Sequence, residues 1–218
     1  TLDTSGLAEG PHQIAARAFD PTGNNGITAN LEGQVDHTAP GVTFDSPATV
    51  TRETRAQFGF QSPSADFDGA DCVSQRPGED LEPEWCDPSE GFAADVPAEG
   101  EWEFTVYATD RAGNVSTATH RFVVDRTAPQ VAFTSGPADA ATVQKSNVEY
   151  GWSVDDATAV SQSCTWDGVD VSVCDGTASK SLPKGDHTFR MVATDAAGNS
   201  SEISRKVTVL VNGDPDPN

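Results

Sequence analysis

The chain has 218 residues, of which 34 are acidic and 13 basic, so its formal net charge is −21 at pH 7. Such an excess of carboxylates argues against nucleic-acid binding, which needs Lys and Arg to neutralise phosphates, and against adsorption to an anionic membrane surface. It favours solubility and the attraction of divalent cations. The 19 glycines, 14 prolines and 7% aromatic residues are typical of a turn-rich β protein with thin cores.

No apolar run reaches the roughly 18 residues of a membrane span, so membrane insertion is not expected. No signal peptide opens the chain, and we therefore expect a processed or excised segment of a longer protein.

Residues 1–38 are predicted to be the C-terminal strands of an incomplete β domain. Alternate residues across 14–18 are apolar or small, a turn follows at 20–24, and 27–35 forms the return strand. A single hairpin is only marginally stable in water. We therefore expect this segment to be the least anchored, and to pack on residues outside this chain, on the next domain or on another copy.

Residues 39–127 are predicted to form a complete domain. Alternating apolar residues mark strands at 42–44, 56–60 and 101–109, and the strand at 117–124 closes the domain. No segment shows helical periodicity.

Residues 128–212 repeat that plan. Apolar alternation predicts strands at 131–133 and 148–154, and Asp167-Gly168 is a strong hairpin signal because both positions tolerate positive φ. The tail at 213–218 is predicted to be a linker of little structure.

The four cysteines fall as two close pairs, one in each complete domain: Cys72 with Cys86, and Cys164 with Cys174. This spacing predicts two disulfides and an oxidising, extracytoplasmic setting. A zinc site would need four ligands at tight spacing, which the sequence does not supply. Each disulfide is expected to stabilise its domain by about 3 kcal/mol.

One phrase, Ala-x-Asp-x-x-Gly-Asn, occurs three times, at 18–24, 108–114 and 193–199. After the first two copies comes Asp-x-Thr-Ala-Pro, at 36–40 and 125–129. The copies lie 90 and 85 positions apart, the length of a small domain. Asp in the first position of a type I turn and Gly in the fourth predict a hairpin turn.

About seven short strands in each unit of about 85 residues describe an immunoglobulin-like sandwich, with strands A, B, C, C′, E, F and G in chain order. The predicted fold class is therefore all-β, with tandem immunoglobulin-like β-sandwiches and one disulfide in each complete unit. The repeated turn is then the turn between strands F and G.

The sequence resembles the Ig-like repeats of large bacterial surface and secreted proteins, which end in Gly-x-His, Ala-x-Asp-x-x-Gly-Asn and Asp-x-Thr-Ala-Pro. His12 and His187 occupy the histidine position, whereas Trp102 replaces it in the middle unit. The third unit lacks the Asp-x-Thr-Ala-Pro ending. The resemblance implies the fold and an extracellular or cell-surface setting in bacteria, and it implies no particular ligand.

Calcium is a candidate ligand of the linkers. Strand G of an Ig-like sandwich ends at the pole opposite the F–G turn, so the linker aspartate should meet the B–C and F–G loops of the next unit. Calcium takes six to eight oxygen ligands. Alternatively, these aspartates only shape turns, and Thr-Ala-Pro stiffens the linker unaided. The first candidate set is Asp36, Asp66, Asp68 and Asp110. The second is Asp125, Asp155, Asp156 and Asp195.

The sequence offers little for catalysis. The four histidines lie on predicted strands or in a linker, and no nucleophile elbow, zinc-protease helix or phosphate loop is present. We predict a non-enzymatic stalk, spacer or adhesive segment with neighbouring Ig-like repeats as its partners. Alternatives are a module that binds a glycan or a protein, with Trp85 beside the long insert 75–84 as the candidate contact, and an accessory region of a large exoenzyme.

Overall fold

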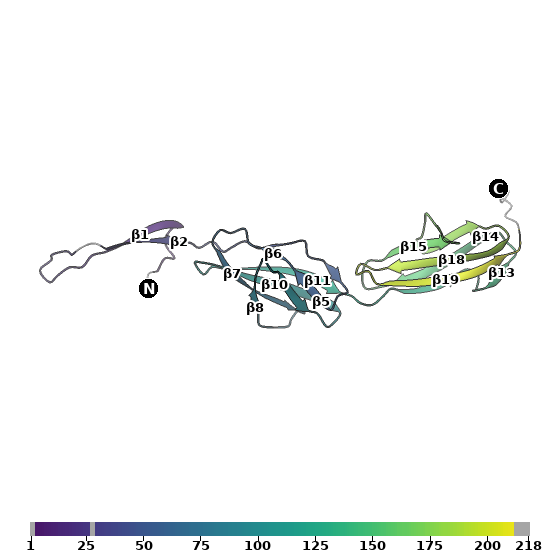
Figure 1. Cartoon of the computed structure of the whole chain (residues 1–218), viewed down its shortest axis with the longest axis horizontal. Coiled ribbons are helices and arrows are strands. Elements are labelled where there is room, and N and C mark those ends of the chain that lie inside the picture. Colours follow the sequence, from purple (N-terminus) through teal and green to yellow (C-terminus); the bar gives the residue numbers. More distant parts are fainter. Residues whose placement is uncertain (1–2, 27–28, 212–218) are drawn as a thin grey trace. The chain divides into compact units, whose positions relative to one another are not determined.

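The computed structural model describes residues 3–26 and 29–211, and over these ranges the chain is built from β-strands (Figure 1). They form an N-terminal hairpin and two Ig-like sandwiches, which confirms the predicted fold class. The predicted linker at 213–218 lies outside the described residues. Within the described ranges there is no helix long and apolar enough to cross a membrane.

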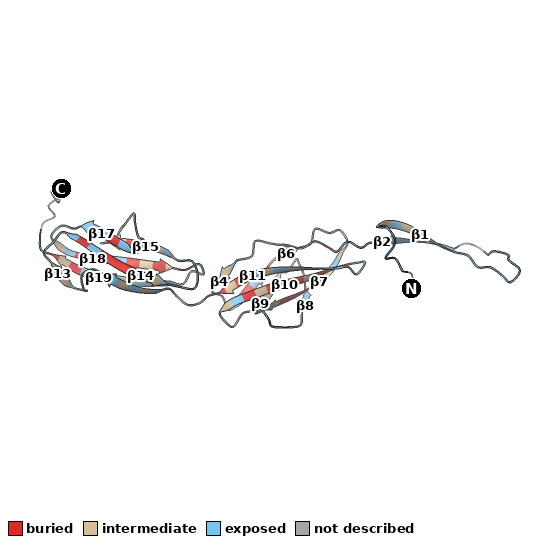
Figure 2. Ribbon diagram, turned by 180° about the vertical axis from the view of Figure 1, so that it is seen from behind, coloured by how far each residue is buried: buried red, intermediate tan, exposed pale blue. Residues whose placement is uncertain are grey.

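The N-terminal hairpin consists of β1 (Gly10–Ala16) and β2 (Ala29–Val35), which pair antiparallel with Ile14 opposite Leu31. Both of these apolar side chains face solvent, with exposed fractions of 40% and 66%. Figure 2 shows the hairpin mostly in the colour of exposed residues, whereas the sandwiches have buried interiors. The strands therefore form as predicted, but they enclose no core of their own among the described residues.

The first sandwich contains a five-stranded sheet in the order β4-β11-β10-β7-β8 and two short pairs, β3 with β6 and β5 with β9. Its strands are β3 (Thr43–Phe44), β4 (Val50–Thr51), β5 (Arg55–Phe58), β6 (Phe60–Gln61), β7 (Phe67–Gln75), β8 (Glu84–Cys86), β9 (Phe92–Asp95), β10 (Gly100–Asp110) and β11 (Val115–Val124).

The second sandwich contains a three-stranded sheet, β12-β14-β17, and a five-stranded sheet, β13-β19-β18-β15-β16. Its strands are β12 (Gln130–Ser135), β13 (Ala141–Val143), β14 (Asn147–Asp155), β15 (Ser161–Trp166), β16 (Val169–Asp170), β17 (Thr177–Ser181), β18 (Gly185–Thr194) and β19 (Ser200–Val209). Asp167 and Gly168 both have positive φ in the turn between β15 and β16, as their sequence predicted.

The sequence predicted a single first strand, A, in each sandwich. The structure instead has two short strands there, because the chain crosses from one sheet to the other partway. In the first sandwich β3 pairs antiparallel with β6, and β4 then pairs in parallel with β11. Ser46, at φ 41°, lies before Pro47 at this crossing. In the second sandwich the crossing follows Gly136, at φ 106°, where a β-carbon would stand only 2.4 Å from Cδ1 of Tyr150.

Alternating side chains of the long strands fill the cores. The inward side chains of β10 are buried as predicted, and Phe104 stacks on Phe58 with ring centroids 4.3 Å apart. In the second sandwich Tyr150 stacks on Phe189 at 5.1 Å, and Trp166 packs on the same ring. Burying such aromatic side chains supplies much of the stability of a thin sandwich.

Both predicted disulfides are confirmed, as Cys72–Cys86 and Cys164–Cys174. The first joins β7 to the neighbouring edge strand β8. The second joins β15 to the segment that follows β16. The first bond thus ties an edge strand to its inner neighbour, and the second ties the segment between β16 and β17 to β15.

Candidate metal centres

The turn between β10 and β11 is built around the Asp110 carboxylate. One oxygen, Oδ1, accepts hydrogen bonds from the main-chain N–H groups of Ala112 (2.9 Å) and Asn114 (2.8 Å). The other, Oδ2, accepts one from the Asn114 side-chain amide at 2.8 Å. Gly113, at φ 90°, supplies the left-handed conformation that closes the turn. These bonds explain why Asp, Gly and Asn recur at this spacing.

The other two copies of the motif fold in the same way. Asn24 and Asn199 each donate from the main chain and from the side chain to the aspartate four residues earlier, at 2.8–2.9 Å. The hydrogen bonds from Asn24 and Thr22 lower the pKa of Asp20 to about 2. For Asp110, burial raises the pKa, but the hydrogen bonds from Asn114 and the turn backbone outweigh it, so the pKa is lowered. This carboxylate is therefore ionised at neutral pH.

The linker aspartates are held by their own turns. Thr38 N–H donates to Asp36 Oδ1 at 3.0 Å, and Thr127 N–H donates to Asp125 Oδ1 at 3.1 Å. The asparagine of the F–G turn also bonds to the linker backbone: Asn114 Nδ2 donates to the Asp36 carbonyl oxygen at 3.2 Å. Each linker is thus bonded to the turn it meets.

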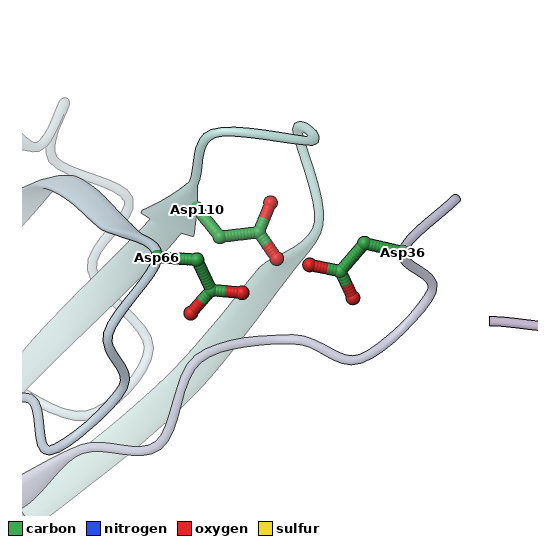
Figure 3. Close-up of side chains that lie close together, drawn as sticks. All are labelled: Asp36, Asp66 and Asp110. Atoms are coloured by element: carbon green, nitrogen blue, oxygen red, sulfur yellow. The ribbon is translucent and has the colours of Figure 1, made fainter. Parts of the chain in front are cut away.

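Three carboxylates meet at the first linker, from Asp36, Asp66 and Asp110, with one oxygen of each within 4.8 Å of the others (Figure 3). Asp110 is buried, and the other two are half-buried. A side-chain hydrogen bond with Asp36 raises the pKa of Asp66; a backbone hydrogen bond opposes this, but burial and the negative charges of Asp36 and Asp110 add to the rise, so the pKa is raised. The crowding of these carboxylates is therefore unfavourable without a cation.

The second linker gathers the equivalent group, Asp125, Asp156 and Asp195, again within 4.8 Å. Asp125 and Asp195 are buried, and Asp156 is half-buried. The Thr158 hydroxyl bridges two of them, lying 3.0 Å from Asp125 Oδ2 and 2.9 Å from Asp156 Oδ1. A cavity of about 340 Å³ beside the group is lined by residues that include Asp125, Asp155 and Asp156.

Two of the eight candidate aspartates lie outside these groups. Asp68 is an exposed residue of β7, and Asp155 is the exposed last residue of β14, opposite Gln130. The neighbouring carboxylates of Asp66 and Asp156 take part instead. Each group therefore offers three carboxylates, enough to hold a divalent cation whose other ligands are water or main-chain oxygens.

Sequence reasoning missed several residues of the linkers. Glu99 accepts hydrogen bonds from the main-chain N–H of Arg126 (2.8 Å) and from the Thr127 hydroxyl (3.0 Å). Glu9 plays the same part at the first linker, toward His37 and Thr38. The sequence signal for these glutamates is a repeated Glu-Gly pair, at 9–10 and 99–100, just before the strand that leads into the F–G turn. The last unit has Lys184 in place of the glutamate.

The remaining candidate residues lie elsewhere. Trp85, on the edge strand β8, is 68% exposed. Among the histidines, His120 packs near the rings of Phe44 and Phe58, and His187 pairs with Asp167. Both histidines thus make contacts within the fold.

Two Ig-like sandwiches in one chain, each with a disulfide and with an acidic group at the turn that meets its linker, define a tandem Ig-like repeat protein. Residues 87–126 and 135–210, more than half of the chain, match the model of the family described as Bacterial Ig-like domain. The chain belongs to this family, as its resemblance predicted. Ig-like domains of this kind are typically non-catalytic modules.

The chain is also similar to several solved structures. Fibronectin(III)-like modules of Clostridium thermocellum CbhA are 15% identical, with a TM-score of 0.46, over 79% of this chain and 94% of theirs. A tetra-tandem repeat from the extending region of a large adhesion protein is 20% identical, with a TM-score of 0.34, over 95% of this chain and 58% of its own. A 1.5-MDa bacterial ice-binding adhesin is 15% identical, with a TM-score of 0.40, over 81% of this chain and 67% of its own. No functional conclusion rests on likenesses this distant. No curated protein matches the chain.

Proposed function

We propose that this chain is a non-enzymatic spacer from a bacterial surface or secreted protein, and that calcium bound at its linkers stiffens it. The proposed units are 1–38, 39–127 and 128–212. The observation that carries the proposal is the repetition of one linker arrangement. At both linkers the aspartate before Thr-Ala-Pro meets the aspartate of an F–G turn and a third carboxylate, which is Asp66 just before β7 or Asp156 just after β14.

A spacer needs rigid units and defined linkers rather than a catalytic cleft. The two disulfides meet the first need, and they fit an extracytoplasmic setting. The hydrogen bonds of Asn114 and Asn199 to the linker backbone meet the second. Adjacent Ig-like repeats are then the partners of each unit.

Calcium suits these sites better than zinc or a transition metal because the groups offer only oxygen ligands. The cation would offset two of the three negative charges at each linker, where at least one of the carboxylates is buried. It would then favour the arrangement in which linker and turn lie together. The unfolded chain lacks that arrangement, so calcium should stabilise the folded state.

The proposal is tested by adding calcium to the full chain and removing it. Titration calorimetry should show two bound ions, EDTA should lower the melting temperature, and small-angle scattering should show a wider spread of dimensions without calcium. Asp156→Asn should remove one ion, whereas the control Asp155→Asn should retain both. If EDTA alters neither the melting temperature nor the scattering, calcium has no part in the function.

A further inference from the structure

A row of three cross-strand neighbours crosses the outer face of the five-stranded sheet in the first sandwich. Asp71 of β7 lies opposite Trp85 of β8 on one side and opposite Tyr107 of β10 on the other. Residues opposite one another point to the same face of a sheet, and Phe104, Val106 and Ala108 of β10 point inward to the core. The row Trp85–Asp71–Tyr107 therefore faces away from the core.

Trp85 is the most exposed aromatic side chain of this sandwich, at 68%. Its indole nitrogen lies 4.0 Å from the point where a β-carbon of Gly69 would stand, so the ring lies beside a residue that has no side chain. An indole placed over backbone keeps a flat apolar surface in contact with solvent. Tryptophan is strongly buried on average, so an indole this exposed is a candidate contact for a ligand.

The surroundings of the ring are polar. Thr109 lies opposite Gly69, and the hydroxyls of Thr105 and Thr119 lie 3.1 Å apart across β10 and β11. Carrying that antiparallel register two residues on places Thr117 opposite Tyr107. Thr105 is buried, so the face offers two aromatic rings with a carboxylate between them and the hydroxyls of Thr109 and Thr117 nearby. It does not offer the contiguous apolar patch typical of a protein-binding surface.

We propose that this row is a binding site for an uncharged glycan. The C–H faces of a sugar ring stack on an exposed indole, while its hydroxyls donate hydrogen bonds to a carboxylate such as Asp71. Trp85 and Tyr107 are two strand spacings apart, about 10 Å, so a glycan laid across the strands contacts both with different rings. The net charge of −21 repels anionic polysaccharides and selects a neutral one.

The second sandwich provides an internal comparison. The first disulfide cysteine of each sandwich sets the alignment of the two five-stranded sheets: Cys72 lies opposite Val106, and Cys164 lies opposite Met191. The positions of Asp71 and Tyr107 are then held by Ser163 and Val192. At these positions the second sandwich lacks both the carboxylate and the aromatic ring, so of the two described sandwiches the first carries the row.

Affinity electrophoresis of the full chain tests the proposal, in gels that contain hydroxyethylcellulose, xylan, laminarin or glycol chitin, with alginate as the anionic arm. At least one neutral polysaccharide should retard the wild type. Trp85→Ala should weaken that binding about tenfold or more, the loss expected for an aromatic hot spot. Asp71→Asn should weaken it less, and Leu81→Ala, an exposed apolar residue of the insert, should leave it unchanged.

Several results would overturn the proposal: no retardation in any neutral gel, retardation by alginate only, or equal binding by Trp85→Ala. A protein partner that binds through Trp85 without any glycan would replace it. Melting curves of each variant show whether the fold is intact. The glycan site stands independently of the spacer proposal, because the calcium titration involves none of these residues.

Discussion

The side-chain amide of Asn199 lies 3.0 Å from the main-chain carbonyl oxygen of Asp125. The same amide donates to the Asp195 carboxylate at 2.8 Å, so one side chain bonds the linker to the turn between β18 and β19. Asn114 repeats this double contact at the first linker. The last residue of the motif is therefore the one that couples a turn to a linker.

Asn199→Ala should lower the stability of the second sandwich by about 1–2 kcal/mol, because Asp195 Oδ2 and the Asp125 carbonyl oxygen both lose the amide donor, while Asp195 Oδ1 keeps its main-chain donor. Urea unfolding measures the change. Asn24→Ala is the matched control, because Asn24 occupies the same turn position but, among the described residues, its side chain donates to Asp20 and Thr22 alone. Equal losses from the two variants would contradict the role assigned to the linker contact.

Asp66→Asn should raise the melting temperature in EDTA at neutral pH. The folded protein raises the pKa of Asp66 above its ordinary value of 3.8, so its contribution to stability is present below that value and is lost as the pH rises through the folded pKa. At neutral pH the ionised group is therefore unfavourable, and an amide removes the repulsion.

The same variant should gain less from calcium than the wild type, because one ligand is lost. Asp68→Asn, on the exposed side of β7, should change neither value. If Asp66→Asn melts below the wild type in EDTA, the crowding at this linker has been misjudged. Thermal scans with and without calcium at one pH give both readings.

Reduction of the disulfides should destabilise both sandwiches. The bonds close loops with sequence separations of 14 and 10 residues, which predicts a loss of about 3 kcal/mol for each in the loop-entropy account. Cys72→Ala/Cys86→Ala should therefore lower the unfolding midpoint of the first sandwich and leave the second unchanged. An intact mass four hydrogens below that of the reduced chain checks the pairing beforehand. A double variant with wild-type stability would contradict this account.

The strands, the disulfides and the meeting of each linker with an F–G turn could be predicted from the sequence. Period-2 alternation identifies strands such as β10 and β14, and the Ig-like topology then brings residues as distant as Asp36 and Asp110 together. The choice between Asp66 and Asp68, or between Asp155 and Asp156, could not be predicted. Asp155 ends β14 and Asp156 follows it, so successive side chains point to opposite faces and one position decides which of them joins the group. Asp66 lies in the turn before β7, whereas Asp68 lies within that strand, and the sequence does not mark where the strand begins.

The change of sheet between β3 and β4 was also beyond the sequence. It depends on positive φ at Ser46, a residue that seldom adopts it, and on the pairing of β4 with β11, which lies some 70 residues away. The hydrogen bonds from the Asn114 and Asn199 side chains to the linker carbonyl oxygens could not be predicted from the sequence either, for a simpler reason. Asparagine after glycine is explained well enough by the turn itself, so its second amide hydrogen called for no partner.

Tyr150→Phe should leave the second sandwich as stable as the wild type, or more stable by up to about 1 kcal/mol. The Tyr150 hydroxyl is buried and has no hydrogen-bond partner among the described residues, so removing it removes only a desolvation cost. Trp152→Phe is the contrast, because Trp152 Nε1 donates to Gln162 Oε1 at 2.6 Å. That variant should be clearly destabilised in the same urea titration. A marked loss from Tyr150→Phe would indicate a bound water at the hydroxyl.

The stability of the second sandwich should fall as the pH rises through the pKa of His187. Its ring nitrogens face two acceptors, with Nδ1 2.7 Å from Asp167 Oδ2 and Nε2 2.9 Å from the Pro183 carbonyl oxygen, so only the protonated ring donates to both. Burial lowers the pKa of His187, but the bonds to Asp167 and Pro183 outweigh it, and the pKa is raised above 6.5.

This contribution is complete below about pH 6.5 and is lost as the pH rises through the folded pKa. It should amount to less than about 1 kcal/mol, because Asp167 is 44% exposed. Asp167 acts in the opposite range: its lowered pKa makes its contribution complete above 3.8 and lost on further acidification. Melting temperatures from pH 5 to 9 should decline for the wild type and stay level for His187→Gln. Parallel curves for the two proteins would show that the ring is neutral throughout.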